Sequence, residues 1–460
     1  GNLEVTLGAR ARGRRRLEDE PLRILVLADL SGRDAAPQAF LPRRVGFESI
    51  DDALAAAAPR VALAIDAPVA IRETLELGAI GDFHPDTLAR RLGAFGTLRL
   101  LGERLSNPAT RDEAFAQLAE LTGGTGPADG GEPNGERPET DDDALERLLG
   151  SSARGRSASR ARNEVQSFIQ GVMASAPTAT PPSTAESERR RIELLQQAAM
   201  RAVLLSQPLR SLERSWRSLD WLIRRLDEEI AEVHALDLSK AALAGHLREH
   251  AGALDRSALH RLLCEPAAVD QWDIIVGDYA FDLDAGDLAL VATIGAIAGQ
   301  AGAPFLAEAG LRLCGCATLD RIDEPADWRV DDALGRLWNE VRSHPAARWV
   351  ALAAPRMLIR QPFGAATDPI DAFAFEELTP RPDHESFLWG NPAFGCAWLL
   401  AQARAGEGNA TRELDEMPTV LYDDGTGQAL KPPVEALLTE RAINRMQASG
   451  LIAMTAHRNT

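Results

Sequence analysis

Three short runs of apolar residues constrain the fold most, because each has the length of one buried strand and ends in a turn signal. They are RILVLADLSG from Arg23, WDIIVGDYAFD from Trp272 and RWVALAAPRML from Arg348. Strands that are apolar on both faces are typical of parallel sheets covered by helices. Helical patterns alternate with these runs at residues 50–57, 85–92 and 287–301. The sequence therefore predicts an α/β fold.

One stretch divides the chain into two parts. From Thr122 to Asp142 the sequence TGGTGPADGGEPNGERPETDD has no apolar periodicity and is rich in Gly, Pro and acidic residues, which is typical of a linker. We predict one α/β layer before this linker and one after it. The predicted units are residues 1–121, the linker 122–142, short amphipathic helices within 143–190, and a large domain over 191–460.

The first residues form a separate pattern. NLEVTLGA, at residues 2–9, alternates like a strand but has no evident pairing partner nearby in the sequence. Five arginines follow between Arg10 and Arg16, and we interpret them as a solvated arm. No apolar segment lies beside them, so a secretory signal is not expected and a cytoplasmic location is predicted.

Composition excludes several classes of function. The chain has 460 residues, of which 45% are hydrophobic and 26% charged, so it has enough apolar material for a sizeable core. Its net charge of −18 argues against broad binding to nucleic acid and favours a basic partner surface. The longest apolar run, Leu288–Gly299, is shorter than the ~20 residues of a membrane-spanning helix. We predict a buried helix there and no membrane insertion.

Candidate catalytic residues are few. Asp29 and Asp278 follow predicted strands, where ligands bind in α/β folds, but neither precedes a glycine-rich phosphate loop. We predict that both form turns or caps. The four cysteines are too sparse for a disulfide framework, and we expect buried thiols: Cys264, Cys314, Cys316 and Cys396.

One spacing leaves an enzyme open as an alternative. HLREH, from His246 to His250, fits the H-x-x-E-H pattern of a zinc hydrolase, with both histidines as ligands and Glu249 as base. No third ligand is evident nearby. The main prediction is therefore a protein with no catalytic, cofactor-binding or metal-binding residues.

The stretch ERSWRSLDWLIRRL, Glu213 to Leu226, places two tryptophans on one predicted helix. Trp216 belongs to an apolar stripe with Leu212, Leu219, Ile223 and Leu226. Trp221 points to nearly the opposite side, at about 100° per residue. Either the helix lies between two layers or Trp221 meets another chain, and we favour packing within the chain.

These residues resemble a motif of the large subunit of the type VI secretion contractile sheath. Trp216, Arg217 and Leu219 match it, Trp221 takes an aromatic position, and Ser218 replaces the usual glycine. Further motifs agree in order: IIVGDYAFD (274–282), AGAPFLAEA (301–309), APRMLIRQPFGAATDPIDAFAFEE (354–377) and FLWGNPAFGCAWLL (387–400). The resemblance covers roughly Ile192 to Thr460.

The N-terminal part resembles the small sheath subunit. LRILVLADLSGR (22–33), VGFESIDDALAAAAPRVAL (45–63) and GDFHPDTLARRL (81–92) follow that subunit's order. The chain therefore resembles a fusion of small and large subunits. Large subunits usually continue past HRNT with further sheet, so the resemblance leaves open whether the assembly contracts.

The resemblance implies a mechanical function. Copies would assemble into hexameric rings around an inner tube protein, contact baseplate proteins, and drive the tube out on contraction. Asp143–Gly150 would be the handle for an AAA+ unfoldase. The strand at Asn2–Leu7 would add to a neighbour's sheet, since a lone strand has unpaired backbone groups. A non-polymerising adaptor of the secretion apparatus is a second alternative.

Overall fold

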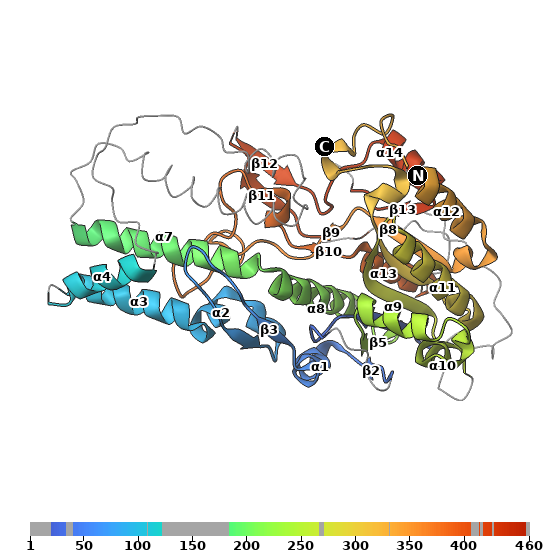
Figure 1. The fold of residues 1–460 in the computed structure, drawn as a ribbon, viewed down its shortest axis with the longest axis horizontal. Helices are drawn as coiled ribbons and strands as arrows, with labels where there is room; N and C mark the ends of the chain where they lie inside the picture. The colour runs from blue at the N-terminus through green and yellow to red at the C-terminus, as the bar shows by residue number, and fades with distance from the viewer. Residues whose placement is uncertain are drawn as a thin grey trace, which may run out of the picture.

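The computed structural model describes residues 20–33, 40–107, 109–121, 184–265, 271–330, 332–405, 414, 417–425 and 427–456 (Figure 1). The predicted N-terminal strand, the arginine cluster, the linker and the short helices within 143–183 lie outside the described residues. The α/β class is confirmed, because helices cover both faces of a mainly parallel sheet.

The main sheet has seven strands in the order β13-β8-β7-β6-β1-β5-β2. All neighbouring pairs are parallel except β2 with β5. The three apolar runs form three of its strands, as predicted. The strands are β1 (Leu22–Ala28), β2 (Arg43–Arg44), β5 (Ala231–Asp237), β6 (Ile274–Phe281), β7 (Phe305–Ala309), β8 (Val350–Ala354) and β13 (Leu451–Ala453).

The prediction of one α/β layer before the linker and another after it is wrong. β1, from the N-terminal part, lies between β5 and β6 of the C-terminal part, with Val26 opposite Ala235 on one side and Val276 on the other. None of the other described strands of the N-terminal part pairs with β1: β2 pairs with β5, and β3 (Arg60–Ala62) pairs with β4 (Thr74–Glu76). A strand that is buried on both faces needs partners on both edges, so β1 takes them from the distant part of the chain.

Side chains of β1 alternate between two hydrophobic cores. Leu25 and Leu27 face α9 (Lys240–Glu249), α10 (Ala258–Cys264), α11 (Ala285–Ala301), α12 (Asp332–Ser343) and α14 (Glu440–Ala448). Ile24 and Val26 face α8 (Gln207–Arg225) and α13 (Pro392–Ala405). The predicted buried helix at Leu288–Gly299 is the middle of α11. No helix among the described residues combines the length and apolar character needed to cross a membrane.

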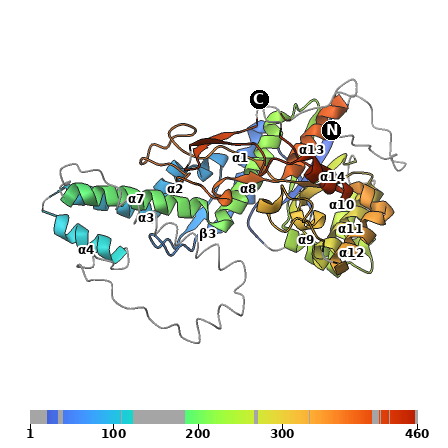
Figure 2. The same cartoon turned by 90° about the horizontal axis from the view of Figure 1, so that it is seen from above.

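A helical arm projects from the sheet (Figures 1 and 2). It contains α3 (Gly93–Ser106), α4 (Arg111–Leu121) and α7 (Thr184–Leu204), which share a separate small core that includes Leu98, Leu118 and Ile192. α1 (Ile50–Ala57) and α2 (Pro85–Arg91) form where helical periodicity predicts them.

The sequence also predicts a strongly helical stretch that runs to about Glu232, and this end point is wrong. α8 ends at Arg225, the chain turns at Asp227, whose carboxylate accepts a hydrogen bond from the Glu229 N–H, and Glu232 lies in β5. The remaining strands form two small antiparallel pairs: β9 (Met357–Leu358) with β10 (Trp389–Gly390), and β11 (Val420–Asp423) with β12 (Gln428–Lys431).

Candidate functional site: the tryptophan helix and the shared sheet

The tryptophan helix α8 is buried between the two parts of the chain. It contacts α13 and β10 of the C-terminal part, and β3 with residues 47–49 and 80–83 of the N-terminal part. Trp216 donates a hydrogen bond from Nε1 to the Leu30 carbonyl (2.9 Å), just past the end of β1. Trp221 lies in the same core, with the Arg225 guanidinium 5.0 Å from its ring centre. Packing within the chain is therefore confirmed for both tryptophans.

A buried network of charges holds α8 against the segment after β9. Glu213, only 1% exposed, accepts hydrogen bonds from Arg217 Nε (2.6 Å) and Arg360 Nε (2.7 Å). Arg360 Nη1 also donates to Glu377 (2.7 Å). Burial alone would raise the pKa of Glu213, but attraction to Arg360 and Arg217 outweighs burial and holds that pKa below its usual value. The carboxylate is therefore charged and paired within the core.

A second network joins the same region to the segment between β12 and α14. The Arg356 N–H and Nε both donate to Glu435 at 2.7 Å, and His384 Nε2 lies 2.8 Å from the same carboxylate. The His384 ring stacks on Trp389 of β10, with ring centres 5.1 Å apart. Burial opposes ionisation of Glu435, yet its hydrogen bonds to His384 and Arg356 lower the pKa to about 2.

This lowered pKa predicts a loss of stability in acid. The contribution of Glu435 is fully present above its unfolded pKa of about 4.3 and decreases as pH falls toward about 2, because the folded state then has to take up a proton. Between pH 6 and pH 2, the free energy of unfolding is expected to fall by roughly 3 kcal/mol less in Glu435→Gln than in the unaltered chain. Urea unfolding of both proteins across this range measures the difference. If the free energy of unfolding changed equally with pH in both proteins, the lowered pKa assigned to Glu435 would be wrong.

A loop of the C-terminal part contacts the N-terminal part through hydrogen bonds and a pair of stacked rings. Asp86, in the first turn of α2, accepts hydrogen bonds from the N–H groups of Asp371 (3.0 Å) and Ala372 (2.8 Å). The rings of Phe95 and Phe373 stack beside them, with centres 5.9 Å apart. Sequence reasoning assigned no role to these residues, since pairing between distant segments leaves no local pattern. The two parts are thus joined by side chains as well as by the shared sheet.

Of the two candidate aspartates, only one forms a turn. Asp29 accepts a hydrogen bond from the Gly32 N–H (2.7 Å), as predicted. Asp278 differs, because it lies inside β6, where the pairing with β7 shifts register between Val276 and Ala280. It is 5% exposed and accepts a hydrogen bond from Ser215 Oγ of α8 (2.5 Å). The prediction of a turn or cap at Asp278 is therefore wrong, and its carboxylate instead contacts the tryptophan helix.

The geometry around HLREH gives no support to a zinc hydrolase. Nε2 of His246 accepts a hydrogen bond from the Ala258 N–H (3.0 Å), so its lone pair is not available to a metal. His250 follows the end of α9, and its Nδ1 lies 2.9 Å from the His246 carbonyl. Within the described residues, no group of three or more His, Cys, Asp or Glu side chains is arranged to hold a metal ion.

The cysteines are free thiols, as expected. Cys314, Cys316 and Cys396 are buried, and Cys264 is partly buried. Burial raises the pKa of Cys314 to about 11 and that of Cys396 to about 12. Both thiols are therefore protonated near neutral pH, which suits packing and not nucleophilic chemistry.

The main sheet has contrasting outer strands. β2 is short and consists of two exposed arginines, a composition that blocks pairing with further strands. β13 is apolar, with Leu451 and Ala453 buried, and within the described residues its only strand neighbour is β8. The backbone of β13 thus offers an edge to which another strand could add.

Residues 189–460 match the family model described as VipB: EvpB/VC_A0108, tail sheath N-terminal domain. The chain belongs to this family, which is one of structural sheath proteins and not of enzymes.

One curated relative supports the same assignment. It is the type VI secretion system sheath protein TssC1 of Pseudomonas aeruginosa, to which the chain is 28% identical over 269 residues. That alignment covers 54% of this chain and 53% of the relative, so the chain spans about half the length of the curated relative. The family match begins at residue 189 and does not extend to the N-terminal part.

Proposed function

We propose that this chain is a self-assembling sheath subunit of a type VI secretion apparatus, with small-subunit-like residues 1–121 fused to large-subunit-like residues 191–460. The observation that carries the proposal is the shared sheet, in which β1 of the first part is a central strand beside β5 and β6 of the second. Two subunits that share one sheet would move as a single rigid unit. Fusing them in one chain would ensure one small-subunit-like part for each large-subunit-like part. Family membership supports the sheath function itself.

Assembly would proceed by strand addition. The strand predicted at Asn2–Leu7 supplies a donor, and the apolar edge of β13 supplies an acceptor. Backbone hydrogen bonds between copies would allow subunits to rotate without separating. Hexameric rings around an inner tube follow from this proposal by analogy with the sheath family.

Deleting residues 2–7 tests this linkage. We expect the variant to remain folded, with an unchanged circular dichroism spectrum, but to sediment as single subunits because the donor strand is gone. Negative-stain microscopy at increasing concentration compares it with the unaltered chain, which is expected to form rings or tubules. Tubules of the deletion variant would rule out this strand as the donor.

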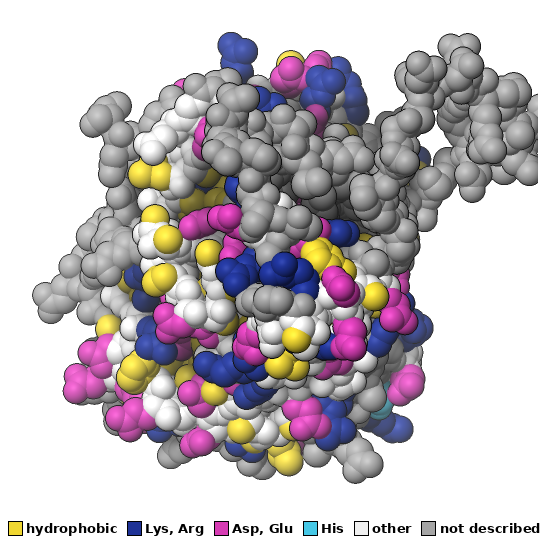
Figure 3. Space-filling view, turned by 90° about the vertical axis from the view of Figure 1, so that its left-hand side faces the viewer, with side chains coloured by type: hydrophobic (Ala, Val, Ile, Leu, Met, Phe, Trp, Pro, Cys, Tyr) yellow, Lys and Arg dark blue, Asp and Glu magenta, His cyan; other side chains and the backbone are white. Residues whose placement is uncertain are grey.

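The remaining partners are part of the same proposal. The inner tube protein and baseplate proteins would contact the assembled subunits, an AAA+ unfoldase would engage Asp143–Gly150, and the assembly would lie in the cytoplasm. On the described part of the end shown in Figure 3, basic and acidic side chains are interspersed. Although the chain has a net charge of −18, the described part of this end has no single acidic patch. An adaptor that never polymerises would instead stay as single particles at every concentration.

A further inference from the structure

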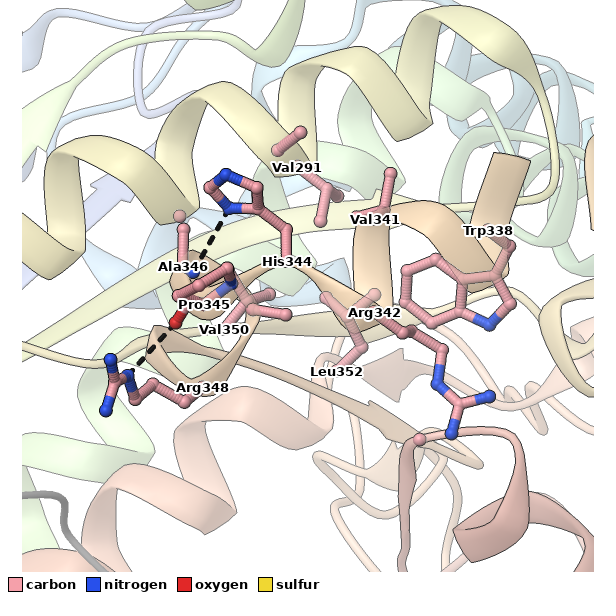
Figure 4. Close-up of a pocket in the computed structure, with 14 residues that line it drawn as sticks. Val291, Trp338, Val341, Arg342, His344, Pro345, Ala346, Arg348, Val350 and Leu352 are labelled. Carbon is pink, nitrogen blue, oxygen red and sulfur yellow. Dashed lines mark hydrogen bonds between the residues drawn. The ribbon is translucent and has the colours of Figure 1, made fainter. Parts of the chain in front are cut away.

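A groove on the face of the sheet that α11 and α12 cover has no role in the function proposed above. It lies between α11, α12 and residues 344–350, and has a volume of about 420 Å³. Figure 4 shows the apolar side chains of Val291, Val341, Val350 and Leu352 between Arg348 on one side and Arg342 with Trp338 on the other. Val341 and Val350 are only half-buried, so the groove presents apolar surface to its surroundings.

The charge of this groove is opposite to that of the chain. Its lining contains Arg342, Arg348 and His344 and no carboxylate, whereas the chain as a whole carries a net charge of −18. Arg342 is held in place by a hydrogen bond from Nη2 to the Ala448 carbonyl (2.8 Å), and Arg348 by one from Nε to the Pro345 carbonyl (3.0 Å). An apolar floor with fixed cations at its rim suits an acidic segment with apolar anchors.

The chain contains such a segment outside the described residues. DDDALERLLG, Asp141–Gly150, begins with three aspartates and has leucines at positions 145, 148 and 149. These leucines would lie on one face if the segment were helical, with the aspartates at the N-terminal end. We propose that this segment docks into the α11–α12 groove of a second copy of the chain, which rests on the self-assembly proposed above.

Chain length favours a second copy over the same molecule. α4, which ends at Leu121, lies at the opposite end of the molecule from α11 and α12 (Figures 1 and 2). A random coil of roughly 20 residues, the number between Leu121 and Asp141, would span about 25 Å on average. α7 alone, with 21 residues, is about 31 Å long. Docking within one molecule would stretch the linker well beyond its average length, whereas a neighbouring copy can bring its segment close.

Peptide binding tests this docking. A labelled peptide of residues 138–152 is titrated, by fluorescence anisotropy, into the full chain whose residues 141–150 are replaced by a Gly/Ser run of equal length. We expect saturable binding that is weakened about tenfold or more by Arg348→Glu, and likewise by Leu145→Asp in the peptide. Arg336→Glu is the matched control, because Arg336 is exposed on α12 but does not line the groove. It is expected to leave binding unchanged.

The outcomes separate this inference from the function on which it rests. No binding, or binding that is insensitive to Arg348→Glu while circular dichroism shows a folded variant, overturns the docking. If the protein forms tubules but the peptide does not bind, the docking is overturned and the sheath proposal stands. A protein that never assembles overturns the sheath proposal, and peptide binding is still measured on it independently.

Discussion

Residues 184–460 expressed without the N-terminal part are expected to be insoluble or unfolded, and co-expression of residues 1–121 is expected to restore a soluble complex. Without β1, the edges of β5 and β6 lose their shared partner, and the two cores lose Ile24, Leu25, Val26 and Leu27, each at most 1% exposed. A missing central strand removes far more than the 5–15 kcal/mol by which domains are usually stable. Co-purification on a tag placed on residues 184–460 measures the rescue.

Two variants of the supplied fragment make this test specific. Val26→Asp places a charge at a fully buried position and is expected to abolish the rescue, at a cost of more than about 4 kcal/mol. Leu41→Asp alters a side chain that is 77% exposed and is expected to rescue normally. Soluble, folded 184–460 on its own would show that β1 is dispensable and would remove the main support for a fused subunit.

The second large effect is expected from Arg360→Met. This change leaves Glu213 with one of its two arginine partners and removes the guanidinium that pairs with Glu377. Removing one member of a buried ion network typically costs about 3–5 kcal/mol, because the remaining charge has been taken out of water. We therefore expect a clear decrease in the urea midpoint of unfolding, and partial recovery when Glu213→Gln is added.

Arg224→Met is the matched control for this variant. Arg224 pairs with Asp220 on the same helix, but its side chain is 50% exposed. Such pairs contribute about 1 kcal/mol or less. If Arg360→Met destabilises the protein no more than Arg224→Met does, the buried network has no special part in holding α8 to the C-terminal part.

Local patterns predicted those elements whose apolar residues are continuous or regularly spaced. β1, β6 and β8 are continuous apolar runs, α11 is a long apolar helix, and the stripe on α8 follows helical spacing, so each could be recognised without its neighbours. β5 could not, because its sequence AEVHALD carries charged and polar residues that extend the helical pattern before it. Its burial comes from pairing with β1, a segment far away in the chain.

The same limit explains the errors about pairing and about Asp278. The apolar run predicts that β1 is buried on both faces, but it does not show which strands pair with β1. A separate α/β layer before the linker is therefore the simpler prediction. Asp278 follows an apolar run, which predicts the end of a strand there, but β6 continues past it with a shift in its register against β7. A partner such as Ser215, on a helix distant in the sequence, is visible only in three dimensions.

The central position of β1 has a consequence during synthesis. β1 ends at Ala28 and leaves the ribosome long before β5, which begins at Ala231, and β6, which begins at Ile274, can meet it. An apolar strand with two unsatisfied edges has to be kept from aggregating throughout that interval. Joining both parts in one polypeptide makes the eventual encounter independent of protein concentration, so even a cell holding few copies could complete the sheet.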